Sequence, residues 1–200
     1  HEKITQFHHH ALKLLESPAG TMTGGAAWAD LGHCAIKLGD LPLAEEVFKK
    51  GLNVPTIFMY MERPRLLAGS ALLALAQGEL DKATRRAESA LALTKEKQMQ
   101  HFFPLTHATM AKVLAARGES ESALAAFGQV EAAALKMGMR PALWEAQLAI
   151  AELLEQAGQS EKARRKRAQA RITIEEIAAF FQDEILREAY LASTLEKIAG

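Results

Sequence analysis

Apolar residues recur along most of the chain at intervals of three and four, which is the spacing of one face of an α-helix. Leu66, Leu67, Ala71, Ala74 and Leu75 form one such series. No segment carries the strict alternation of apolar and polar residues that is typical of a half-buried strand. The pattern therefore predicts an all-α protein. The expected helices span residues 2–16, 25–38, 42–52, 56–77, 80–96, 100–117, 120–137, 141–157, 160–181 and 183–198.

Four short strings interrupt this pattern at almost constant spacing, and in each of them an alanine follows a glycine five positions later. They are Gly39–Ala44, Gly78–Ala83, Gly118–Ala123 and Gly158–Ala163, so the glycines are 39, 40 and 40 residues apart. Because glycine enters the left-handed conformation without strain, it can end a helix. We expect a helical hairpin that is used four times, with a nearby Asp, Glu or Ser as the cap of each second helix. The small alanine lets the two helices approach closely.

Three prolines bear on where helices begin. Pro42 lies at the first turn of its expected helix, where a missing N–H group costs little. Pro64 and Pro104 fall within or just before the first helices of their repeats. They either mark the start of these helices or kink longer ones.

The first repeat carries a recognisable set of residues. Trp28, Leu31 and Gly32 lie on its first helix, and Ala44 and Phe48 lie on its second. This set resembles the tetratricopeptide repeat (TPR), although the period of about 40 residues exceeds the usual 34. The later repeats keep the alanine after the turn but have alanine in place of the first-helix glycine. With its longer period, the chain is similar to the TPR-like arrays of MalT-type regulators and related bacterial multidomain signalling proteins.

The resemblance implies a right-handed α-solenoid that forms a single domain over residues 1–200. Residues 1–24 would be a preceding helix and loop, residues 25–181 the four repeats, and residues 182–200 a C-terminal capping helix. The first helix is either the second half of a hairpin whose partner is missing or a cap in its own right. The chain opens without methionine, which suggests a processed chain or a piece of a longer protein.

In a TPR-like array the first helices line a concave surface, and the repeat register assigns residues to it. The candidate binding residues on this surface are His33, Arg65, Leu72, Lys112, Glu145 and Glu152. Their charge runs from neutral, through basic at Arg65 and Lys112, to acidic at Glu145 and Glu152. The Lys/Asn clamp that some TPR domains use for acidic C-terminal peptides is absent. Either these charges bind a partner or they only keep the face solvated.

Two apolar segments stand outside the regular pattern, one period apart. They are Thr56–Met61 and Gln98–Pro104. Exposed methionine and aromatic side chains are typical of adaptable binding surfaces. The candidate apolar contact residues are Phe58, Met59, Tyr60, Phe102 and Phe103. The alternative is that long helices need these extra apolar residues for packing between repeats.

Composition and charge exclude several classes of protein. Lys+Arg and Asp+Glu number 24 each, so the net charge is zero, which argues against a general nucleic-acid binder. Cys34 is the single cysteine and excludes a disulfide framework. No apolar window is long enough to span a membrane, and no signal peptide precedes the first expected helix. We therefore expect a cytoplasmic protein.

Candidate metal and anion sites are weak. The consecutive His8, His9 and His10 point in different directions on a helix and do not converge on a metal. The basic run Lys162–Arg167 lies near Glu161 and other acidic residues, which favours ion pairs on a solvated face. Neither a phosphate-binding loop nor a GxSxG or HExxH motif is present. We expect no cofactor, no metal and no enzymatic activity.

The resemblance implies a non-catalytic scaffold that binds a protein or peptide, as the regulatory part of a larger bacterial signalling or transcription-regulatory protein. An alternative is the effector-sensing domain of a MalT-type regulator, with a small-molecule pocket around Trp28, His33, Arg65 or Phe58. A homodimer formed through an end helix is a further expectation.

Overall fold

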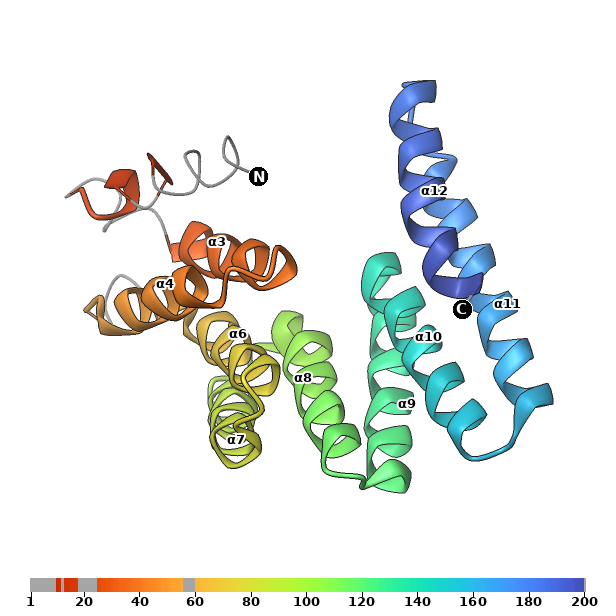
Figure 1. Cartoon of the computed structure of the whole chain (residues 1–200), viewed down its shortest axis with the longest axis horizontal. Helices are drawn as coiled ribbons and strands as arrows, with labels where there is room; N and C mark the ends of the chain where they lie inside the picture. Colours follow the sequence, from red (N-terminus) through yellow and green to blue (C-terminus); the bar gives the residue numbers. More distant parts are fainter. Residues whose placement is uncertain (1–9, 12, 18–24, 56–59, 200) are drawn as a thin grey trace. The chain divides into compact units, whose positions relative to one another are not determined.

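The computed structural model describes residues 10–11, 13–17, 25–55 and 60–199, and within these ranges every regular element is helical. The chain divides into two units, His1–Phe102 and Phe103–Gly200, which we describe separately. The helices of unit 1 are α3 (Gly25–Lys37), α4 (Leu41–Asn53), α6 (Arg63–Ala76), α7 (Leu80–Glu96) and the 3-10 helix η1 (Gln100–Phe102). The helices of unit 2 are α8 (Phe103–Ala116), α9 (Ser120–Met137), α10 (Arg140–Gln156), α11 (Ser160–Ala178) and α12 (Glu184–Ala199). Figure 1 shows these helices in chain order.

Most expected helix limits are confirmed to within one residue. The exceptions are α11, which ends three residues early, and the segments before α6 and α8. The helix expected over residues 2–16 lies largely outside the described residues, of which 10–11 and 13–15 are helical. Pro64 is the second residue of α6, and Pro104 is the second residue of α8. Both prolines therefore mark helix starts, because their missing N–H groups and fixed φ suit the first turn. The helix expected from residue 56 begins instead at Arg63.

The turn within each hairpin is confirmed in its backbone geometry. The four glycines have φ between 71° and 79° in the left-handed region. In each turn the residue after glycine donates its N–H to a carbonyl five positions earlier, as Asp40 does to Ala35 at 2.9 Å. Capping by a side chain is found at Asp40, which accepts from the Leu43 N–H at 3.1 Å. Glu79, Glu119 and Gln159, the equivalent residues, make no side-chain cap bond, so that expectation was wrong for three hairpins.

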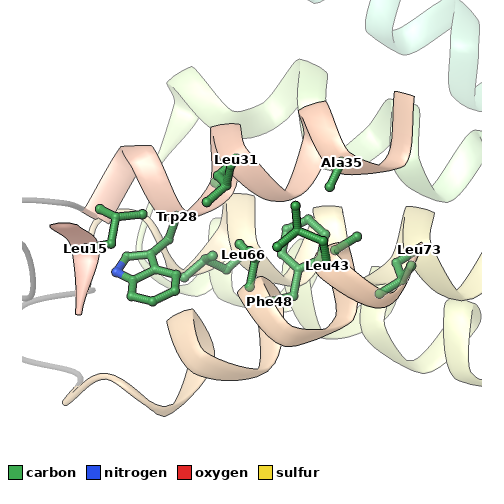
Figure 2. Close-up of a cluster of buried hydrophobic side chains, with 11 residues drawn as sticks. Leu15, Trp28, Leu31, Ala35, Leu43, Phe48, Leu66 and Leu73 are labelled. Carbon is green, nitrogen blue, oxygen red and sulfur yellow. The ribbon is translucent and has the colours of Figure 1, made fainter. Parts of the chain in front are cut away.

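The core of unit 1 is formed around two aromatic side chains, Trp28 of α3 and Phe48 of α4, which are both fully buried (Figure 2). The Phe48 ring lies against glycines on two other helices. A Cβ at Gly32 of α3 would lie 2.8 Å or less from three ring carbons, and a Cβ at Gly69 of α6 would overlap two of them. Glycine is therefore required at both positions by the volume of the ring.

The core of unit 2 includes two clusters among the described residues. The first joins Phe127 and Val130 of α9 to Ala111 of α8 and Ile150 of α10. The second centres on Trp144 of α10, together with the buried Ala170 and Ile174 of α11 and four side chains of α12: Tyr190, Leu191, Leu195 and Ile198. The alanine that follows each turn glycine by five residues, such as Ala123, is fully buried in all four hairpins. The expected close approach of paired helices is thus confirmed.

Candidate interaction surface

The α10 helix leaves a single stripe exposed. Its exposed residues are Pro141, Glu145, Glu152, Glu155 and Gln156. They recur at intervals close to whole helical turns, and Leu148, which completes the stripe, is half-buried. The other faces of α10 pack against α9 and α11, and many of their residues are buried. Two candidate residues from the sequence, Glu145 and Glu152, therefore lie on the one side of α10 that a partner could contact.

The equivalent positions on α8 and α12 form similar stripes, although α12 is exposed on other sides as well. On α8, Leu105, Ala108 and Ala115 are half-buried and Lys112 is exposed. On α12, Ile185, Glu188 and Ala192 are exposed, forty residues after Glu145, Leu148 and Glu152. We call these three stripes together the first-helix face of unit 2. Trp144 of α10 packs against α12, and α8 also contacts α10, so the stripes belong to neighbouring helices.

The basic run of α11 is occupied by ion pairs, as the sequence favoured. Glu161 pairs with both Arg164 and Arg165. Lys166 contacts both carboxylate oxygens of Glu131 at 2.7 Å, and Arg167 reaches Glu155 at 2.8 Å. The hydrogen bonds of Glu155 with Ser160 and Arg167 hold the pKa of its carboxyl below the usual range. These bases therefore leave little free positive charge on α11.

The candidate residues of unit 1 behave differently from those of unit 2. Arg65 forms ion pairs with Asp30 of α3 and with Glu62, to which it lies at 3.1 Å. It is therefore not the free basic position that the sequence suggested, because both acids neutralise it. Leu72 is half-buried on α6. The charge of Arg65 is thus compensated within unit 1.

His33 of α3 is a half-buried residue rather than an open binding group. Its Nδ1 lies 2.7 Å from the Ala29 carbonyl, and since a carbonyl only accepts, Nδ1 carries the proton. Nε2 is then a buried acceptor, with no hydrogen-bond partner among the described residues. Burial lowers the pKa of His33 below 6.5, and Arg65 and Lys37 act in the same direction, against the Ala29 bond and Asp30. Burial therefore favours the neutral imidazole.

The candidate apolar contact residues are only partly available. Phe58 and Met59 lie outside the described residues. Tyr60 is 39% exposed, whereas Phe102 is buried. Phe103 is half-buried and stacks on His107 with ring centroids 3.6 Å apart. The alternative expectation, that these residues serve packing, agrees with the positions of Phe102 and Phe103.

A polar network inside unit 2 was not expected from the sequence. Gln147 of α10 is buried, donates to Glu131 of α9 at 3.3 Å, and accepts from Thr173 of α11 at 3.3 Å. Glu131 in turn pairs with Lys166. A glutamine at the position where the first repeat has Trp28 was the one available signal. The network connects α9, α10 and α11 through buried and half-buried side chains.

Two other classes of site find no support in the described part of the chain. No group of three or more His, Cys, Asp or Glu side chains in these ranges could hold a metal ion. None of the helices described is both long enough and apolar enough to cross a membrane.

Comparisons with known proteins define the fold. No protein-family model matches the chain, and no curated protein sequence matches it. Among solved structures, BtubC (BKLC) from P. vanneervenii is 15% identical, with a TM-score of 0.63 over 99% of this chain and 85% of that one. A proposed kinesin light chain of Podosopora anserina with nearly identical TPR-like repeats is 18% identical, with a TM-score of 0.57 over 87% of this chain and 92% of that one. A substituted form of the same protein is 20% identical, with a TM-score of 0.54 over 88% of this chain and 85% of that one. The chain therefore has the all-helical, TPR-like repeat fold of the α-solenoid class.

Proposed function

We propose that this chain is a non-catalytic scaffold that binds a protein or peptide on the first-helix sides of its hairpins. The TPR-like fold supports the proposal, because stacked helical hairpins create extended surfaces for partners. The observation that carries it is the exposed stripe of α10. Glu145 and Glu152 lie on this stripe without an ion-pair partner in the described part of the chain, whereas the rest of the helix serves the core.

The proposal includes a regulatory role within a larger bacterial signalling or transcription-regulatory protein of the cytoplasm. The repeat period of about 40 residues, which resembles that of MalT-type arrays, supports this assignment. We also include self-association through an end helix. Light scattering at high concentration tests it, since a mass of 21.8 kDa would exclude a stable dimer.

Small-molecule sensing has weaker support in unit 1. Trp28 is fully buried, and the His33 ring lies so close to α6 that a Cβ at Gly69 would come within 3.0 Å of its Cε1. Arg65 is engaged by Asp30 and Glu62. Phe58, the fourth residue of the expected pocket, lies outside the described residues. No specific observation favours an effector over a protein partner.

Site-specific photo-cross-linking tests the scaffold proposal. A photoreactive amino acid at Lys112 or Glu152 should capture a discrete protein from cells, because both positions are exposed on the first-helix face. The same amino acid at Arg164 or Glu121, which are exposed on second helices, serves as the matched control. Equal capture at all four positions, or none at the first two, would exclude a partner on this face.

A further inference from the structure

Some acidic side chains of unit 2 form ion pairs with bases of the same unit, and others do not. Glu131, Glu155 and Glu161 pair with bases of α11. By contrast, three carboxylates on the first-helix face have no basic partner in the part of the chain that the structure describes: Glu145, Glu152 and Glu188. The neutral charge balance of the whole chain thus conceals three carboxylates on α10 and α12 that form no ion pair among the described residues.

The arrangement on α10 sets a spacing for whatever binds there. Glu145 and Glu152 are seven residues apart, so they project from the same side of the helix, roughly 10 Å apart along its axis. Leu148 lies between them and is half-buried. The stripe therefore presents an aliphatic side chain between two carboxylates.

The α12 helix extends this surface with a mixture of the same kind. Ile185 is 78% exposed, and Glu188, one turn further along, is also exposed. Glu145 is close enough to α12 to contribute to the raised pKa of Tyr190, whose main cause is burial. Apolar and acidic groups thus alternate across two neighbouring helices.

We infer that the first-helix face of unit 2 binds a basic segment of a protein partner, in which two Lys or Arg side chains flank an aliphatic one. The inference rests on the proposed scaffold function and specifies the chemistry of the partner. Charge complementarity places the cations at Glu145 and Glu152, and the aliphatic group at Leu148. Lys112 holds the position on α8 that Glu152 holds on α10, so it repels a cation there and confines the basic segment to α10 and α12.

A library of random dodecapeptides displayed on phage tests this chemistry with the full chain as bait. Peptides selected by the wild-type chain should be enriched in Lys and Arg over Asp and Glu. The enrichment should disappear with the Glu145→Gln/Glu152→Gln variant. It should persist with Glu121→Gln, because Glu121 is also exposed, without an ion pair in the described ranges, but lies on α9. Circular dichroism and thermal unfolding establish that each variant is folded.

The best peptide, synthesised with a fluorescein label, allows the effect to be measured by anisotropy. We expect the double variant to bind it about tenfold more weakly at low ionic strength, since each exposed ion pair changes affinity by a few-fold. The difference should shrink in high salt, because screening weakens exposed charge pairs. The Glu121→Gln control should bind like the wild-type chain.

The outcomes separate this inference from the scaffold proposal. Acidic or neutral peptides, no selected peptide at all, or an affinity that the double variant leaves unchanged would overturn the basic-segment inference. If photo-cross-linking at Lys112 and Glu152 still captures a protein in that case, the scaffold function stands with a partner of different chemistry. If cross-linking fails as well, both proposals fall.

Discussion

Units 1 and 2 are made of the same hairpin, but they stabilise it in different ways. In unit 1 the Phe48 ring fills the space left by Gly32 and Gly69, and the Arg65 charge is compensated by Asp30 and Glu62. In unit 2 the equivalent aromatic, Phe127, packs in a cluster with Ala111, which stands where the first repeat has Gly32.

The difference shows that one repeat pattern can be packed in two ways. Unit 1 has a core that depends on two absent Cβ atoms, so it tolerates little added volume. Unit 2 accepts alanine there, holds three helices with a polar network around Gln147, and leaves Glu145 and Glu152 uncompensated at its surface. The TPR-type residues of the first hairpin are therefore explained by packing, because the Phe48 ring needs glycine at position 32.

The largest expected effect contrasts a glycine of each unit. Gly69→Ala should lower the free energy of unfolding of unit 1 by about 3 kcal/mol, because the new methyl group overlaps the Phe48 ring. Gly128→Ala on α9 should raise that of unit 2 by about 0.5–1 kcal/mol, since nothing lies within 4 Å of a Cβ there and alanine favours the helix. Denaturant unfolding with peptide-resolved hydrogen exchange assigns each change to its unit.

A double-mutant cycle sharpens the same contrast. In a Phe48→Ala background the overlap with Gly69 is gone, so adding Gly69→Ala should cost little or nothing. If Gly69→Ala destabilises the protein equally with and without the Phe48 ring, the packing explanation is wrong.

The second effect concerns the polar network of unit 2. Lys166→Met should lower the free energy of unfolding by about 1–2 kcal/mol, because Glu131, whose side chain is 21% exposed, loses its cation. Adding Glu131→Gln should recover much of the loss, since a neutral amide can still bond Gln147. Urea unfolding of both variants measures this, with Arg164→Met as a control on a fully exposed pair. An equal loss for Lys166→Met and Arg164→Met would show that burial of the network is unimportant.

A third effect concerns the pH dependence of unit 1, and His107 of unit 2, whose pKa burial also lowers, acts with the same sign. Burial lowers the pKa of His33, so the folded unit 1 favours the neutral imidazole. The resulting stability is complete above the unfolded-state value near 6.5 and is lost as pH falls through the lower folded-state pKa. The loss amounts to about 1.4 kcal/mol for each pH unit by which the pKa is lowered. Urea unfolding between pH 8 and pH 5 measures this loss of stability. The His33→Gln variant should show a weaker dependence of stability on pH. A pKa of His33 at or above 6.5 in an NMR titration would contradict the explanation.

Much of the fold was predictable because its signals are local. A glycine in each turn, a proline at the second position of several helices and a period near 40 residues fix helix ends within the hairpin. The start of α6 was misplaced since the apolar segment after residue 56 has helical composition, and only Pro64 signals the boundary. We expected a side-chain cap in every hairpin, but Glu79 and Glu119 do not form the cap hydrogen bond that Asp40 forms at the equivalent position.

The candidate surface was predictable only in part. The repeat register assigned Lys112, Glu145 and Glu152 to first helices, and all three are exposed. Whether a charge is free depends on residues far along the chain: Arg65 is 35 residues from Asp30, and Lys166 is 35 residues from Glu131. Such pairs form between helices of different hairpins, so a charge pattern along one helix cannot reveal them.

The smallest effect compares the turns between hairpins in the two units. Gln98 of unit 1 has φ 51°, whereas Gly138, forty residues later in unit 2, has φ 67°. Since the left-handed conformation costs a residue with a Cβ about 1 kcal/mol, Gln98→Gly should stabilise unit 1 slightly and Gly138→Gln should destabilise unit 2 by a similar amount. The greater freedom of glycine in the unfolded chain reduces the first gain, so we expect about 0.5 kcal/mol, measured as a shift in the urea midpoint. Opposite signs for the two substitutions would support a common turn geometry, whereas destabilisation by both would show that the Gln98 side chain contributes contacts that outweigh its backbone strain.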